Sequence, residues 1–115
     1  RIPLSDAQSR REETRIAGLD CNPYLGIAAS LACGCLGLIN EGRPSPQFRG
    51  DAYEGDGDIP RVLGSALDLF DGATALHEVL GPEFARVYSI VKRAEYDEFL
   101  QVISPWEREH LLLNV

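Results

Sequence analysis

Apolar side chains are spread unevenly along this chain, and their spacing mainly predicts helices. From Pro23 to about Ile39 nearly every position is apolar, so a helix there has no polar face. Asn22 can cap its start, and Pro23 suits the first helical position because its missing N–H is not needed there. Gly42 is suited to a left-handed residue after the helix end. The pattern therefore predicts a buried helix at 22–40.

Residues 61–115 show a helical period that is interrupted at a few points. Apolar residues from 62 to 80 keep this period around an interruption at Asp71-Gly72. Gly81-Pro82 ends this stretch and starts an amphipathic helix that continues to Ile103. Ser104-Pro105-Trp106-Glu107 has the pattern of a capping box, which predicts one more helix start. The segment 61–115 is therefore expected to be a helical tail.

The segment 42–60 has the composition of a long acidic surface loop. It is rich in Pro, Gly and acidic residues and has few apolar anchors. Asp56 and Asp58 have the spacing of two calcium-loop ligands. The full twelve-position pattern and its terminal Glu are missing, so a solvated loop is preferred to a calcium site.

The N-terminal segment 1–17 is expected to contain two short strands. Pro3 favours an extended Ile2 at the end of the first strand, and residues 5–10 form a polar loop. Residues 11–16 would then form the second strand of a hairpin. The expected fold class is α+β, mostly α in this chain, with a short N-terminal β-hairpin followed by helices.

A charged stretch, Arg11-Glu12-Glu13-Thr14-Arg15, provides the candidate chemistry. If it is extended, Arg11, Glu13 and Arg15 share one face, because side chains alternate along a strand. Three charges cannot face a dry core unpaired. They fit either an edge strand that blocks edge-to-edge pairing or a site where a carboxylate binds a metal and guanidinium groups bind phosphate or carboxylate oxygens.

Composition limits the possible partners and compartment. The 115 residues are 44% hydrophobic, which allows one domain with one core, and the absence of Met with a start at Arg1 indicates a piece of a longer protein. The net charge of -7 argues against binding to nucleic acid or to an anionic membrane. The apolar run between Pro23 and Asn40 is only marginally long enough to span a bilayer and includes three Gly, so a buried core helix is preferred to a membrane helix. Three cysteines do not suit a closed disulfide framework and fit a reducing cytoplasm.

Several motifs, in this order, resemble the C-terminal part of the glutamine synthetase catalytic domain. They are Arg1-Ile2-Pro3, Arg11-Glu12-Glu13-Thr14-Arg15, a six-residue spacer, Asn22-Pro23-Tyr24-Leu25 with its Ala-rich helix, Ala94-Glu95-Tyr96, and Ser104-Pro105-Trp106-Glu107-Arg108-Glu109 with the Leu-rich tail. The resemblance extends over the whole chain, so the chain is expected to be the C-terminal segment 1–115 of such a domain, with the active-site strands at 1–17.

The resemblance implies an ATP-dependent ligase that forms γ-glutamyl phosphate and then an amide with ammonia or an amine. By this resemblance, Glu13 is a ligand of Mg²⁺ or Mn²⁺. Arg15 is catalytic and contacts glutamate or the transferred phosphate. Arg1 and Arg11 contact the phosphates of ATP. The implied partners are glutamate, ammonia or an amine, and further copies of the chain in a ring-shaped homo-oligomer.

Some features depart from the family and leave alternatives open. The family's other metal ligands lie upstream, so the 115-residue chain alone is expected to be inactive. Glu12 stands where the family usually has an apolar residue. The turn Gly18-Leu19-Asp20 resembles the branch that joins glutamate to polyamines at least as well, so a γ-glutamylputrescine or polyamine synthetase is an alternative. A non-catalytic helical assembly element is the other alternative.

Overall fold

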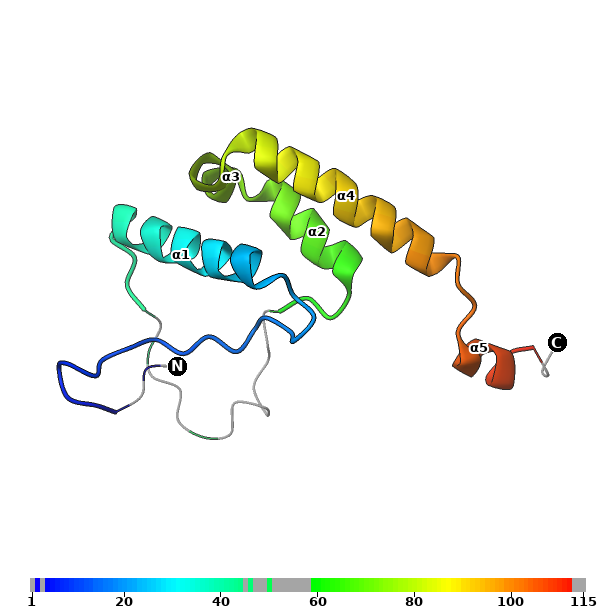
Figure 1. Cartoon of the computed structure of the whole chain (residues 1–115), viewed down its shortest axis with the longest axis horizontal. Coiled ribbons are helices and arrows are strands. Elements are labelled where there is room, and N and C mark those ends of the chain that lie inside the picture. Colours follow the sequence, from blue (N-terminus) through cyan, green and yellow to red (C-terminus); the bar gives the residue numbers. More distant parts are fainter. Residues whose placement is uncertain (1, 3, 45, 47–49, 51–58, 113–115) are drawn as a thin grey trace. The chain divides into compact units, whose positions relative to one another are not determined.

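A computed structural model of the protein describes residues 2, 4–44, 46, 50 and 59–112, and the regular structure in them is helical (Figure 1). The helices are α1 (Pro23–Ile39), α2 (Leu63–Gly72), α3 (Thr74–Leu80), α4 (Pro82–Leu100) and α5 (Pro105–His110). They belong to two compact units, Arg1–Pro44 and Ser45–Val115. Asp56 and Asp58, the pair of the calcium-loop alternative, lie outside the described residues.

The start of α1 follows the sequence prediction. The Asn22 side-chain oxygen accepts hydrogen bonds from the backbone N–H groups of Tyr24, at 3.0 Å, and Leu25, at 3.4 Å. These are donors that a helix N-terminus otherwise leaves without partners. Pro23 occupies the first helical position. The residues between Asn22 and Ile39 therefore form the helix that the local signals predict.

The end of α1 differs from the prediction for Gly42. Glu41, not Gly42, takes the left-handed conformation, with φ 49°. This lets the Gly42 N–H donate to the Gly37 carbonyl at 2.8 Å and the Glu41 N–H donate to the Leu38 carbonyl at 3.2 Å, the pattern of a Schellman motif. A Cβ on Gly42 would lie 3.2 Å from the Gly37 oxygen, so glycine serves close approach there.

Much of the apolar surface of α1 is exposed in this chain. Ala32 is the buried residue of the helix, whereas Tyr24 is 83% exposed and Leu38 is 81% exposed. Its burial thus remains a prediction for a longer protein. No helix within the described residues has both the length and the hydropathy needed to cross a lipid bilayer.

The predicted N-terminal β-hairpin is wrong, because the described residues contain no strand. Residues 10–16 run without regular structure before α1 (Figure 1). The polar loop before them is turned by Asp6, whose carboxylate accepts a hydrogen bond from the Ser9 N–H at 2.7 Å. A strand is stable only with a hydrogen-bonded neighbour and an apolar face to pack on, and two strands alone rarely suffice. The mostly helical character of the predicted fold class is correct.

In the second unit, α2 and α4 pack side by side in antiparallel directions (Figure 1). At one end Gly64 lies against Tyr96, where an added Cβ would be 3.1 Å from a ring carbon. Nearer the other end Phe70 meets Tyr88 edge to face at 5.4 Å between ring centroids. Leu67 and Ala85 are buried. The helix α4 ends at Leu100, three residues before the predicted Ile103.

The helix α5 begins with the capping box that the sequence predicts. The Ser104 hydroxyl accepts a hydrogen bond from the Glu107 N–H at 3.2 Å. In return, the Glu107 carboxylate accepts one from the Ser104 N–H at 2.7 Å. Both bonds satisfy donors at the helix start. They lower the pKa of Glu107, because backbone and side-chain hydrogen bonds from Ser104 favour the charged carboxylate.

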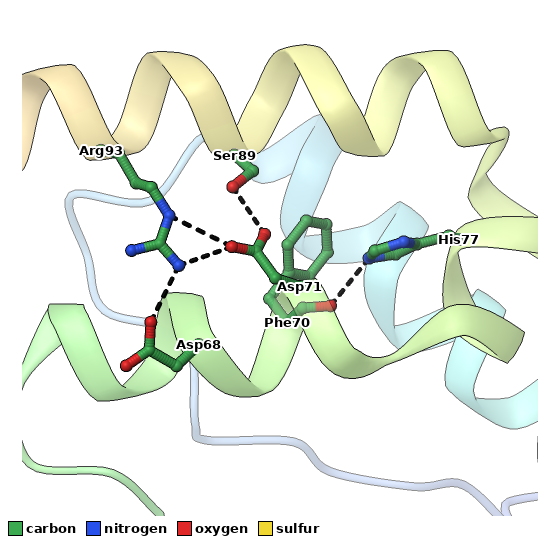
Figure 2. Close-up of polar contacts among 6 residues, drawn as sticks. All are labelled: Asp68, Phe70, Asp71, His77, Ser89 and Arg93. Carbon is green, nitrogen blue, oxygen red and sulfur yellow. Dashed lines mark hydrogen bonds and ion pairs between the residues drawn. The ribbon is translucent and has the colours of Figure 1, made fainter.

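A polar cluster, here called the α2–α4 clamp, joins these two helices and consists of Asp68, Asp71, Ser89 and Arg93 (Figure 2). Arg93 donates to both acids, at 2.9 Å to Asp68 and at 2.5 Å to Asp71. The Ser89 hydroxyl donates to the other Asp71 oxygen at 2.6 Å. The clamp aligns the last turn of α2 with the middle of α4.

Acid should weaken the α2–α4 clamp through Asp71. The Ser89 hydrogen bond, and then Arg93, hold the Asp71 pKa below its ordinary value of 3.8. A carboxyl whose pKa is depressed by folding stabilises the fold above its ordinary pKa, and this is lost as the pH falls through the folded value. We expect Ser89→Ala to move acid-induced loss of helix to higher pH, as measured by circular dichroism. The same shift with Asp97→Asn, at an exposed acid of α4, would contradict this role of Asp71.

Candidate functional site

The first unit brings together three of the predicted site residues. An Arg11 guanidinium nitrogen lies 3.1 Å from one oxygen of Glu13, and an Arg15 guanidinium nitrogen lies 3.8 Å from the other. Glu13 therefore lies between two cations on one face of the segment, as the alternation of side chains predicts. Arg1, the fourth predicted site residue, lies outside the described residues.

Exposure differs between the carboxylate and the cations of this charged face. The Glu13 side chain is 27% exposed, whereas the side chains of Arg11 and Arg15 are 58% and 75% exposed. Exposed ion pairs of this kind stabilise a protein little, because water screens them. The guanidinium groups are accessible to phosphate or carboxylate oxygens, which they bind in a planar, bidentate manner. The charged face can therefore receive anionic groups.

The other face of the same segment borders a pocket that the sequence reasoning missed. Glu12 and Thr14, which share a hydrogen bond of 2.9 Å, line it from the segment. Ile27, Ser30 and Leu31 line it from α1, and its volume is about 370 Å³. The signal was present in the sequence, since alternation sends residues 12 and 14 away from the charged face. The segment thus has a charged face and a pocket face.

A short turn joins the charged segment to α1. The Cys21 N–H donates to the Gly18 carbonyl at 3.2 Å, which reverses the chain just before the Asn22 cap. Cys21 also lines the pocket, where its sulfur would lie 3.4 Å from a Cβ added to Gly26. The turn and the cap together fix the position of the charged segment relative to the start of α1.

The described residues do not form a complete metal site. They contain no group of three or more His, Cys, Asp or Glu side chains placed to hold a metal ion. Glu13 offers one carboxylate, and the two neighbouring guanidinium groups oppose a cation. Mg²⁺ requires near-octahedral oxygen coordination, usually with one or two carboxylates, waters and substrate phosphates. Glu13 therefore fits only as one ligand of a site that other groups complete.

The two histidines interact with backbone carbonyls in the second unit. A ring nitrogen of His77 lies 2.7 Å from the Phe70 oxygen (Figure 2), and a ring nitrogen of His110 lies 3.1 Å from the Trp106 oxygen. His77 also lies against the Phe70 ring, at 4.8 Å between centroids. These contacts give both residues a structural role.

Comparison with known proteins extends over nearly the whole chain. Residues 1–111 match the family model described as glutamine synthetase, catalytic domain. The chain is 31% identical to a glutamine synthetase of Halobacterium salinarum, covering 97% of the chain and 27% of the relative. It is 36% identical to the γ-glutamylputrescine synthetase of Escherichia coli, covering 99% of the chain and 24% of the relative.

A third relative broadens the range of amines. The chain is 32% identical to a glutamate–isopropylamine ligase of a Pseudomonas species, covering 93% of the chain and 24% of the relative. The chain thus spans about a quarter of the length of the curated relatives it matches. No solved structure matches it.

Proposed function

The chain belongs to the glutamine synthetase family, and from that premise we propose that it is a segment of an ATP-dependent ligase joining glutamate to ammonia or an amine. The observation that carries this proposal is the charged face, where Glu13 lies between Arg11 and Arg15. A ligase of this kind must gather anionic oxygens and neutralise them. One carboxylate and two accessible guanidinium groups on one face suit that task.

The proposed roles are those that the resemblance to the family implies for each position. Arg15, the more exposed of the two cations of the charged face, contacts the glutamate carboxylate or the transferred phosphoryl group. Arg11, together with Arg1, contacts the phosphates of ATP. Binding of these anions replaces the contacts of Arg11 and Arg15 with Glu13 and frees the Glu13 oxygens. Glu13 then serves as one ligand of a Mg²⁺ or Mn²⁺ ion whose other ligands come from the rest of the protein.

The chemistry needs both cations, because each acts on a different charge. ATP supplies the phosphoryl group that activates the glutamate side chain, and the divalent ion neutralises charge on the phosphates. Arg15 orients the carboxylate that becomes activated and stabilises the charge on the transferring group. Arg11 holds the nucleotide so that its terminal phosphate is aligned with that carboxylate.

The acceptor is ammonia or a small amine. The similar proteins carry names of glutamine, γ-glutamylputrescine and isopropylamine ligases, and they have closely similar identities to this chain. The second candidate, a γ-glutamylputrescine or polyamine synthetase, is favoured by the somewhat higher identity to the E. coli enzyme. The two candidates share the charged face and differ in the acceptor.

Amine-dependent release of ADP tests the proposed function. A full-length protein carrying this segment, supplied with ATP, Mg²⁺ and glutamate, should release ADP faster with ammonia, putrescine or isopropylamine than without an amine. Arg15→Gln should raise the KM for glutamate, because it removes a bidentate contact. Arg61→Gln, the same change at an exposed arginine before α2, is the matched control. The absence of amine-dependent ADP release with every acceptor would favour a non-catalytic assembly element.

A further inference from the structure

The pocket on the pocket face of the charged segment combines apolar walls with one charged group. Much of its apolar lining comes from the first half of α1, from Pro23, Ile27 and Leu31. Among the described residues that line it, Glu12 is the only charged one. Its volume of about 370 Å³ lies at the lower end of the range of about 300–1,000 Å³ that is usual for small-molecule sites. The pocket thus has the size and lining of a site for a small ligand with one charge.

Glu12 determines which charge the ligand carries. Its carboxylate accepts a hydrogen bond of 2.9 Å from the Thr14 hydroxyl. A carboxylate has about four acceptor sites on its two oxygens, so this bond leaves most of them for a ligand. An anion would be repelled by the carboxylate. An uncharged apolar molecule would remove water from it without replacing the lost hydrogen bonds, which is costly. The pocket therefore favours a cation.

The hydroxyl groups of the pocket suit an ammonium ion. An alkylammonium group has three N–H donors and no acceptor. Both hydroxyl groups already use their own hydrogen, because Thr14 donates to Glu12 and Ser30 donates to the Gly26 carbonyl at 2.9 Å. Their oxygens still have lone pairs that can accept. The pocket thus offers acceptors to an ammonium group and apolar walls to the chain attached to it.

We propose that this pocket binds a primary alkylammonium ion with a short apolar chain. The ammonium group contacts Glu12, and the chain lies against Ile27 and Leu31. A diamine suits the pocket less well, because its second ammonium group would lie against apolar walls. The proposal goes beyond the proposed function and does not depend on ligase activity. It places a cation on the face of the segment opposite to the charged face, whose guanidinium groups attract anions and repel cations.

Saturation-transfer difference NMR on a full-length protein that carries this segment tests the proposal, because it detects small ligands that bind weakly. The probe is n-butylammonium chloride, titrated in the absence of ATP, glutamate and metal. The matched ligand control is n-butanol, which carries an uncharged group on the same four-carbon chain. We expect n-butylammonium to have a dissociation constant about threefold to tenfold lower than that of n-butanol, because its hydrogen bond to the carboxylate is charge-assisted.

Two variants with matched controls locate the bound amine. Glu12→Gln should weaken n-butylammonium binding by about threefold to tenfold, because it removes only the charge, whereas Glu78→Gln on α3 should not weaken it. Ile27→Ser should reduce the gain in affinity from methylammonium to n-butylammonium, which is at most about fourfold per buried methylene. Leu69→Ser, at an exposed apolar residue of α2, should preserve this gain. Circular dichroism confirms that each variant stays folded.

Several results would overturn the proposal. Equal n-butylammonium binding by Glu12→Gln and the unaltered protein would place the amine elsewhere, and absence of saturation transfer would show that it does not bind. Equal affinity for n-butanol would show that the pocket does not select the charge. Tighter binding of Nα-acetyl-lysine amide, which carries the same ammonium group on a four-carbon chain, would indicate a peptide ligand and contradict a free amine. The titration contains no ATP, so its failure leaves the proposed ligase activity to be judged by ADP release.

Discussion

Glu13→Ala in a full-length protein that carries this segment is expected to lower the turnover number by on the order of 100-fold or more. Glu13 is the carboxylate of the charged face, and both of its oxygens face guanidinium nitrogens. Its removal would take away a proposed metal ligand. It would also leave Arg11 and Arg15 without the carboxylate that orders them. The measurement is ADP release at saturating glutamate, ATP and acceptor.

The comparison with Glu78→Ala separates a site effect from a general effect of lost charge. Glu78 is an exposed carboxylate on α3, in the other compact unit. Its replacement should leave turnover close to that of the unaltered protein, because surface substitutions away from special features have small effects. Near-normal turnover of the Glu13→Ala protein at saturating metal would remove Glu13 from the site.

The 115-residue chain by itself is expected to show no amine-dependent ADP release. Its described residues provide no cluster of metal ligands, and it spans about a quarter of the length of its relatives. Arg11 and Arg15 can attract anions, but positioning the reacting groups requires a preorganised site that excludes water. The assay uses ammonia, putrescine and isopropylamine in turn. ADP release that stays proportional to the amount of the chain through successive purification steps would contradict this expectation.

Helix starts were predictable because their signals are local. Asn22 with Pro23, Gly81 with Pro82, and the capping box at Ser104 each provide partners or dihedral angles within a few residues. The shared face of Arg11, Glu13 and Arg15 was predictable for the same reason, since it depends on the alternation of side chains.

Features that depend on distant or alternative partners were not predictable in the same way. The expected hairpin at 1–17 requires neighbouring strands, which no local signal supplies. At the end of α1 Glu41, and not the expected Gly42, takes the left-handed position, and this conformation lets the Gly42 N–H donate to the Gly37 carbonyl. The α2–α4 clamp joins Asp71 to Arg93, 22 positions apart, so helical periodicity alone does not specify it.

Binding of Mn²⁺ tests the central claim, that this segment contributes Glu13 to the site of a ligase, most directly. The measurement is a titration of the full-length protein followed by the electron paramagnetic resonance signal of free Mn²⁺, in the absence of turnover. Glu13→Ala should weaken one class of Mn²⁺ sites by about tenfold to 100-fold, the range seen when groups that support a metal site are lost. Glu78→Ala should bind as the unaltered protein does. Identical Mn²⁺ binding by the Glu13→Ala protein and the unaltered protein would contradict the claim.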